Sequence, residues 1–296
     1  MNDKIRVIHR SDPGCCGGTD SYVDESLPKE IVSERIVYFK AHSALGWAVT
    51  DREKRFDRIS AFAAPASEGT FIFLETFASS GSRTDFAVIK GDILPKLAGL
   101  VREWGLAGRN GFHSYTNGLP EDFGGSIEIA YDSGERISIS DNQAPVLIYD
   151  TAERIAGSFS EALAGERVEA PEASEVKEIR FNEERENGGF TEAVLTFLPD
   201  GTAINRKRRR FDDPTVYESS KPLPAEEAEK LRRGIDTSGI LLWSGLPDNG
   251  YSLRDNKRLT FLLEGGREIA VKSGRLLPES LSGGFFNIEL QMTTVY

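Results

Sequence analysis

The stretch Ile127-Glu-Ile-Ala-Tyr-Asp-Ser-Gly-Glu-Arg-Ile-Ser-Ile-Ser140 has a counterpart 132 positions later, Leu259-Thr-Phe-Leu-Leu-Glu-Gly-Gly-Arg-Glu-Ile-Ala-Val-Lys272. Each stretch has two runs of alternating apolar residues around a glycine-containing turn, which is the pattern of a β-hairpin. Pairing Gly134 with Gly266 also aligns Ile137 with Ile269. The repeat predicts that one folding unit occurs twice in the chain, which fixes the architecture and leaves the activity open.

The residues before and after the first hairpin predict the rest of the first unit. Alternation and β-branched or aromatic residues indicate strands at 33–39, 70–77 and 86–89. Asp92 can cap a helix whose apolar residues recur at three- and four-residue spacing as far as Trp104. A glycine-rich loop is expected over 105–125, and a second helix is expected from Asp150 to Gly165.

The second unit repeats this order of elements. Strands are predicted at 176–181 and 192–198, and a helix begins at Pro224. The pattern at 285–295 is ambiguous, because alternate residues are apolar as in a strand and a helical stripe fits equally well. The repeat favours a helix there.

Runs of strands joined by short turns imply antiparallel pairing, so the predicted fold class is α+β, with two related units that each pack a helix on an antiparallel sheet. The expected domains are a flexible N-terminal arm at 1–30, a first unit at 31–165, a linker at 166–175 and a second unit at 176–296. The arm is rich in Gly, Ser, Asp and Pro and can bury little apolar surface.

The composition restricts the partners of the chain. The chain has 296 residues, 39% of them hydrophobic, and a formal net charge of −11, which repels nucleic acid phosphates and anionic membranes. No run of about 18 apolar residues predicts a membrane helix, and the first ten residues lack the apolar core of a signal peptide. We therefore expect a cytoplasmic protein without nucleic acid or membrane partners. Adjacent Cys15 and Cys16 do not form a disulfide framework, and their role stays open.

Motifs with known chemistry are missing from the sequence. We find no HExxH, CxxC, GxSxG, Walker-A or GxGxxG pattern, so neither a metal nor a cofactor is predicted. His113 is one of three histidines and lies in a polar segment with Arg109, Asn110 and Tyr115, which are candidate binding residues. A hydrolase would need His113 within hydrogen-bond reach of an acid, for which Asp122, Glu128 and Asp132 are the candidates.

The run Arg206-Lys-Arg-Arg-Arg210 is the strongest charge anomaly of this acidic chain. In a strand, Arg206, Arg208 and Arg210 would share one face, and Lys207 would lie on the other. A solvated edge strand protected by charge is the favoured interpretation. Contact with a protein, or binding of a polyanion through Arg206, Arg208 and Arg210, is the alternative.

Several segments resemble an uncharacterised bacterial family of two-repeat α+β proteins from anaerobic gut bacteria. In the first half they are 27–33, 110–112, 118–125, 131–137 and 141–143, and in the second half Trp243-Ser-Gly, Gly265-Gly266 and 273–278. These are mainly turn and hairpin residues, so the resemblance implies a fold. It implies no catalytic residues, because the family has no assigned activity.

These observations favour a non-enzymatic cytoplasmic binding or protein-interaction module, whose partner is another protein or a second copy of the chain. The segments 105–125 and 243–256 occupy equivalent positions in the two units, so we expect them to line a shared surface. Their candidate binding residues are Arg109, Asn110, His113, Tyr115, Trp243, Asp248 and Tyr251.

Overall fold

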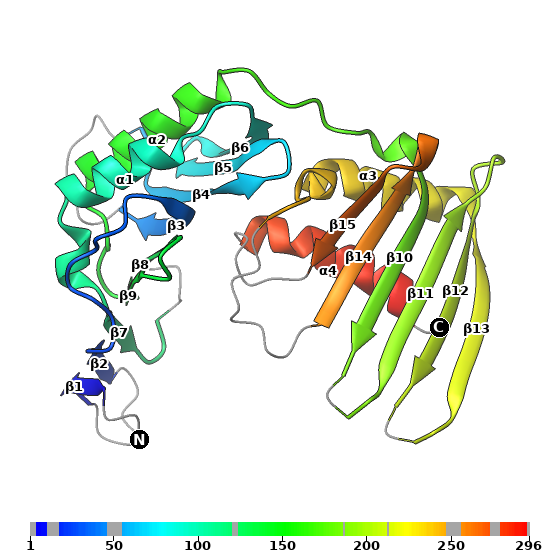
Figure 1. Cartoon of the computed structure of the whole chain (residues 1–296), viewed down its shortest axis with the longest axis horizontal. Coiled ribbons are helices and arrows are strands. Elements are labelled where there is room, and N and C mark those ends of the chain that lie inside the picture. The colour runs from blue at the N-terminus through cyan, green and yellow to red at the C-terminus, as the bar shows by residue number, and fades with distance from the viewer. Residues whose placement is uncertain are drawn as a thin grey trace. The chain divides into compact units, whose positions relative to one another are not determined.

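The computed structural model describes residues 4–10, 18–45, 55–119, 124–185, 187–211, 213–246, 256–272 and 279–294. The chain divides into two compact units, Met1–Val168 and Glu169–Tyr296, each built around its own sheet (Figure 1). The sheets have nine and six strands, and the described residues form four α-helices. The predicted α+β class is confirmed, although strands contribute more of each unit than the sequence indicates.

The first sheet has the strand order β1-β2-β7-β9-β8-β3-β4-β5-β6. Its strands are β1 Ile5–His9, β2 Thr19–Asp24, β3 Ile36–Ala44, β4 Arg58–Ala66, β5 Gly69–Ala78, β6 Gly81–Ile89, β7 Phe112–Thr116, β8 Gly125–Tyr131 and β9 Arg136–Asp141. All neighbours pair antiparallel except β7 and β9, which pair in parallel. The parallel contact joins β1, β2 and β7 to the rest of the sheet.

Two helices lie on one face of this sheet (Figure 1). Helix α1, Leu94–Glu103, packs on β3, and α2, Tyr149–Leu163, packs on β4, β5 and β6. The N-cap position of α1 is Ile93 and not the predicted Asp92, although Asp92 Oδ1, one residue earlier, accepts the Leu94 N–H at 2.9 Å. The buried core between the layers includes Phe39, Leu97 and Phe159.

The second sheet has the order β13-β12-β11-β10-β14-β15, with all neighbours antiparallel. Its strands are β10 Val176–Glu184, β11 Phe190–Phe197, β12 Ala203–Arg210, β13 Val216–Leu223, β14 Asn256–Leu263 and β15 Glu268–Lys272. Helices α3, Ala225–Ser238, and α4, Glu279–Thr293, lie side by side on one face (Figure 1). The buried residues include Phe181, Leu231, Phe261 and Ile288.

The two sheets agree in the order of six strands. Reading from β6, the first sheet runs β6-β5-β4-β3-β8-β9, and reading from β13, the second runs β13-β12-β11-β10-β14-β15. From β3 in the first unit and from β10 in the second, the chain forms four strands, a helix, two strands in a hairpin and a closing helix, and β7 is an additional strand before the hairpin of the first unit. The first sheet alone continues beyond this set, through β7, β2 and β1.

Local details agree as well. The register between β3 and β8 shifts at Ile36–Tyr38, and the register between β10 and β14 shifts at Val176–Glu178. Both α1 and α3 are followed by a left-handed glycine, Gly105 with φ 60° and Gly239 with φ 61°, before a 3-10 turn. Only glycine adopts this conformation without steric cost, so the same residue ends the helical segment in each unit.

Several expectations are corrected. The flexible arm is wrong for 4–10 and 18–30, because β1 and β2 lie there and pair with each other and with β7. The loop at 105–125 contains the 3-10 turn η1, Leu106–Arg109, and strand β7, whose polar sequence gives no apolar alternation. Strand β12 is not an edge strand, since β13 covers it. Cys15 and Cys16 lie outside the described residues.

The ambiguous C-terminal segment is a helix, α4. Its residues Phe285, Ile288 and Met292 are buried, as the helical spacing requires. Of the expected linker, Arg167 pairs with Ile89 of β6, and Ala173–Glu175 form a 3-10 turn, η3, before β10.

Candidate functional site

The open face of β1, β2 and β7 is the candidate site. Directly paired residues of neighbouring strands point to the same face of a sheet. Val7 pairs with Tyr22, Tyr22 with His113, and His113 with Ser140 of β9. The intervening Phe112 packs against the core under the helices. The row from Val7 to Ser140 therefore lies on the face that α1 and α2 do not cover.

Apolar side chains on this face are unusually exposed. Ile5 is 43% exposed, Val7 48%, Tyr22 37% and Tyr115 47%. Isolated exposed apolar residues are common on proteins, whereas a group of them on adjacent strands is typical of a contact surface. These four residues come from three strands that have no counterpart in the described part of the second unit.

His113 lies at the centre of the row. Its Nδ1 is 2.8 Å from Ser140 Oγ, and its ring stacks on Tyr22 with 5.1 Å between ring centroids. Burial lowers the pKa of His113, while Asp24 and Glu128 oppose this shift. The imidazole is therefore neutral at pH 7, and its ring can donate or accept a hydrogen bond.

A ladder of polar side chains holds the extension together on the other face. Thr19 Oγ1 is 2.8 Å from Thr116 Oγ1, and Ser21 Oγ is 2.9 Å from Ser114 Oγ. Asn142 adds two hydrogen bonds to the backbone of Thr116. Hydroxyl and amide pairs replace apolar packing between β2 and β7, which is why the hydrophobic pattern does not predict these strands.

Two of the predicted binding residues have structural contacts. The side chain of Asn110 is fully buried, and its amide contacts the carbonyls of Pro28 and Arg136 and the N–H of Ser138. Arg109 Nη1 donates to the carbonyl of Val146 at 3.1 Å. The buried side chain of Asn110 therefore joins the segment at Pro28 to strand β9, and it cannot contact a ligand at the surface.

The predicted binding residues of the segment 243–256 are Trp243, Asp248 and Tyr251, and none of them is found exposed in the described part of the chain. Trp243 is 2% exposed and follows the 3-10 turn η4, Ile240–Leu242, in the core of the second unit. Asp248 and Tyr251 lie outside the described residues. A surface shared by 105–125 and 243–256 stays a prediction.

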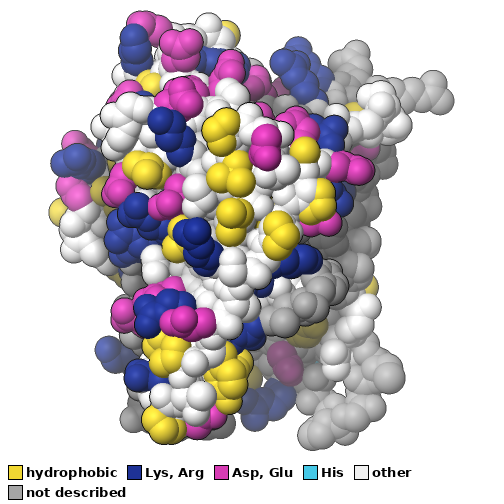
Figure 2. Space-filling view, turned by 90° about the vertical axis from the view of Figure 1, so that its right-hand side faces the viewer, with side chains coloured by type: hydrophobic (Ala, Val, Ile, Leu, Met, Phe, Trp, Pro, Cys, Tyr) yellow, Lys and Arg dark blue, Asp and Glu magenta, His cyan; other side chains and the backbone are white. Residues whose placement is uncertain are grey.

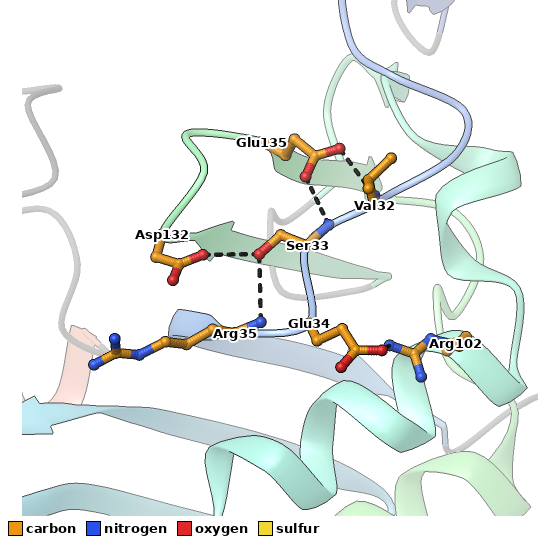
Figure 3. A network of polar contacts seen from close by, with 7 residues as sticks. All are labelled: Val32, Ser33, Glu34, Arg35, Arg102, Asp132 and Glu135. Carbon is orange, nitrogen blue, oxygen red and sulfur yellow. Dashed lines mark hydrogen bonds and ion pairs between the residues drawn. The ribbon is translucent and has the colours of Figure 1, made fainter.

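The acids suggested for a hydrolase have other contacts. Asp132 accepts the Ser33 hydroxyl at 2.8 Å, and Glu135 accepts the N–H groups of Val32 and Ser33 (Figure 3). This network fastens the segment before β3 to the turn of the β8–β9 hairpin. Glu128 accepts the Tyr38 hydroxyl at 3.4 Å, and Asp122 lies outside the described residues.

The basic run is divided between the two faces of β12, as predicted. Lys207 is buried on the helix side, where its ammonium donates to the carbonyl of Thr294, and Asn205 Nδ2 donates to Met292 O at 3.0 Å. These groups satisfy carbonyls at the C-terminus of α4 and complement its dipole. Lys207 therefore has a structural role.

On the open face, Arg208 forms ion pairs with Glu192 and Glu218, both at 3.1 Å. Arg210 donates to the carbonyl of Gly188. Arg206 has no ion pair within the described part of the chain. Positive and negative side chains alternate over the side of the molecule seen in Figure 2, without a continuous positive patch. Polyanion binding at this run stays a prediction.

Two cavities lie elsewhere in the first unit. A groove of about 660 Å³ runs between α2 and the β5–β6 hairpin, with Arg55, Arg83 and Arg167 in its lining. A smaller cavity of about 360 Å³ is lined by Lys29, Arg102 and Tyr131, among others. Burial raises the pKa of Tyr131 to about 12, so its hydroxyl is protonated at pH 7.

Comparison with known proteins adds no assignment. Neither a protein-family model nor a curated protein matches the chain. Within the described residues there is no group of three or more His, Cys, Asp or Glu side chains that could hold a metal ion. No helix in that part of the chain is long and apolar enough to cross a membrane.

The sequence identified His113 and Tyr115 but missed their neighbours. Val7 and Tyr22 lie in the segment expected to be a flexible arm, and Ser140 lies in the second strand of the hairpin from which a repeat is predicted. The short run Ile5-Arg-Val-Ile8 is the one signal that a strand begins there.

Proposed function

We propose that the protein is a non-enzymatic protein-binding module made of two copies of one α+β unit, and that the first copy carries the binding site. The partner contributes an extended segment that adds to the outer edge of β1. The observation that carries this proposal is the group of exposed apolar side chains on β1, β2 and β7. Main-chain hydrogen bonds of an added strand supply affinity, and alternate side chains supply specificity.

The proposed duplication is supported by three independent agreements. The hairpin offset of 132 residues found in the sequence also relates Tyr131 to Leu263, whose N–H groups close equivalent turns on Glu135 and Arg267. The order of six strands agrees, and so does the position of the register shift. Two unrelated α+β units could share one of these features by chance, whereas a duplication accounts for the hairpin offset, the strand order and the register shift together.

The choice of β1 follows from a comparison of the four sheet edges. Beyond β6 the chain itself returns, with Lys90 N–H donating to Glu166 O and Val168 N–H to Val88 O. Strand β13 carries Pro222, which lacks an N–H, and the two exposed residues of β15, Glu268 and Lys272, are both charged. These are common ways to prevent edge pairing. No described residue pairs with the outer edge of β1, where Ile8 is 51% exposed.

The partner segment is expected to be apolar and basic. The chain carries a formal net charge of −11, which favours encounter with positively charged partners. On the open face, Asp24 has a lowered pKa because Ser26 donates to it from both its hydroxyl and its N–H, so this carboxylate is ionised at pH 7.

The test compares two exposed valines on edge strands. Val7 of β1 is 48% exposed and Val216 of β13 is 40% exposed, so each tolerates a charge without loss of core packing. Wild-type protein, Val7→Glu and Val216→Glu are incubated in extract of the source cells and examined by native mass spectrometry. A stoichiometric protein complex that is lost in Val7→Glu and kept in Val216→Glu supports the proposal. A complex insensitive to Val7→Glu, or no complex with the wild type, contradicts it.

A hydrolase is the second candidate, because the 2.8 Å contact between His113 Nδ1 and Ser140 Oγ joins a base to a hydroxyl. A neutral imidazole can accept the hydroxyl proton as the oxygen attacks an ester. It ranks second because no carboxylate among the described residues hydrogen-bonds to the ring. Hydrolysis of p-nitrophenyl acetate that is lost in Ser140→Ala and kept in Ser138→Ala would favour the hydrolase over the binding module.

A further inference from the structure

The groove between α2 and the β5–β6 hairpin is lined by side chains of the hairpin that point toward the helix side of the sheet and by one face of α2. Thr76 of β5 pairs with Arg83 of β6, and both lie on the helix side of the sheet. Across from them, α2 presents Glu153, Ala156, Gly157 and Ser160 along one face, and its C-cap residue Ala164 follows. The small residues of α2 keep this space open at about 660 Å³, the size of a site for a small organic ligand.

Three guanidinium groups reach the groove from separate segments of the chain. Arg167 is fixed by Asp85, with contacts of 3.1 and 3.3 Å, and by the carbonyl of Leu163 at 2.8 Å. Arg55 lies 3.6 Å from Glu153. For Arg83 the described part of the chain provides neither an ion pair nor a hydrogen bond. Three cations and two carboxylates leave the groove one positive charge in an acidic protein.

The remaining polar groups of the groove are hydroxyls. Thr76, Ser80, Ser82 and Ser160 line it, and each hydroxyl can both donate and accept a hydrogen bond. A guanidinium recognises phosphate or carboxylate oxygens with two parallel hydrogen bonds, whereas hydroxyl groups suit a polyol.

Gly157 adds to the open space of the groove, because it has no side chain on the α2 wall. Glycine in the middle of a helix costs about 1 kcal/mol relative to alanine. A Cβ atom built on Gly157 would meet no other atom within 4 Å, so packing inside the protein does not require a glycine there.

We propose that this groove binds a phosphate monoester of a small polyhydroxy compound, with Arg83 contacting the phosphate and Arg55 and Arg167 flanking it. The hydroxyls of Ser80, Ser82 and Ser160 contact the polyol. This site is independent of the protein-binding surface, because β6 and β1 are opposite edges of the first sheet.

Isothermal titration calorimetry of the full chain tests this proposal with glucose 6-phosphate, ribose 5-phosphate and glycerol 3-phosphate, and with glucose and inorganic phosphate as controls. We expect at least one phosphate ester to bind more tightly than both controls. Arg83→Ala should raise its Kd about tenfold or more, because a charge-assisted pair is lost. Added salt should weaken the binding.

A pair of helix glycines provides the matched control. Gly99 of α1 also has open space at its Cβ position, but it lies outside the groove. Gly157→Leu should abolish binding by filling the groove, whereas Gly99→Leu should leave the Kd unchanged, and circular dichroism should show both variants folded.

Three outcomes would overturn the proposal. The first is that the esters bind no more tightly than glucose or inorganic phosphate. The second is that Arg83→Ala or Gly157→Leu leaves the Kd of the bound ester unchanged. The third is that none of the three esters binds at about 5 mM, well above the Kd expected for even a weak specific site.

Discussion

The two units have the same arrangement of six strands, but they differ in what lies beside it. In the first unit three further strands extend the sheet past β9, and they carry exposed apolar side chains around His113. Among the described residues of the second unit, the sheet ends at β15 without such an extension. The shared strands hold the cores, and the features that suggest binding lie where the units differ.

A second difference lies under the closing helices. One row of paired residues crosses the first sheet through Ile127, Ala41, Ala61 and Leu74. The corresponding row in the second sheet is Leu259, Phe181, Ala193 and Lys207. Leu74 lines the open groove beside α2, whereas Lys207 caps the C-terminus of α4. The same position in the row therefore faces an open groove in the first unit and the end of a helix in the second.

The largest expected effect comes from the shared core. Phe261 of β14 and Ile129 of β8 occupy matching positions, and both are at most 2% exposed. Replacing each by alanine leaves a cavity, so Phe261→Ala should lower the free energy of unfolding by about 3–5 kcal/mol and Ile129→Ala by about 2–5 kcal/mol. Urea denaturation followed by circular dichroism measures both. A loss below about 1 kcal/mol in either variant would show that the two positions are not equivalent core sites.

Lys207→Met tests the difference between the closing helices. The change leaves the carbonyl of Thr294 without its donor, so the free energy of unfolding should fall by about 1–3 kcal/mol. Arg206→Met is the control, because its exposed side chain should change stability by less than about 0.5 kcal/mol. Equal effects of the two variants would contradict a capping role for Lys207.

The pH dependence of stability tests the environment of His113. Burial lowers its pKa in the folded state, so the unfolded chain binds the proton more readily. Stability from this residue is complete above its unfolded pKa of about 6.5 and decreases as the pH falls toward the folded pKa. Between pH 7.5 and 5.5 the melting temperature should fall less in His113→Gln than in the wild type. An equal decrease of the melting temperature in the two proteins would show that the imidazole of His113 is exposed to solvent and would contradict its burial.

The smallest effect is expected at the turn shown in Figure 3. The N–H groups of Val32 and Ser33 lower the pKa of Glu135, so its stabilisation is present above the unfolded pKa of about 4.5 and is lost as the pH falls through the folded pKa. Glu135→Gln should lower the melting temperature slightly at pH 7 and have no effect at pH 2.5. A difference that persists at pH 2.5 would contradict this role of the carboxylate.

The sequence predicts the elements whose apolar pattern is strong. Both hairpins, helix α1 and the strand containing Thr70–Ile72 follow from periodicity, and the repeat indicates the C-terminal helix. Four of the nine residues of β4 are alanine, and β13 is exposed along seven of its eight residues, so neither shows clear alternation. Strand β7 is held by hydroxyl pairs, which no hydrophobic pattern reveals.

The candidate sites depend on pairing between strands that lie far apart in the sequence, which a local sequence pattern does not predict. The sequence places His113 and Tyr115 in a polar loop, but the contacts of His113 with Tyr22 and Ser140 and the pairing of Tyr115 with Asp20 arise from strand pairing over long sequence distances. The groove likewise joins Arg55, Arg83 and Arg167, which no single motif connects. Asn110 and Trp243 illustrate the converse, because polar or aromatic character alone does not distinguish a buried side chain from a ligand contact.

Hydrogen–deuterium exchange of the partner complex is the most direct test of the central claim that the extension of the first sheet is the binding surface. Amide exchange is compared between the free protein and the complex, at β1 and at β13, an edge strand of the second sheet that serves as the control. The account predicts slower exchange at Ile5–His9 in the complex and unchanged exchange at Val216–Leu223. Unchanged exchange at β1, or protection at β13 instead, would contradict it.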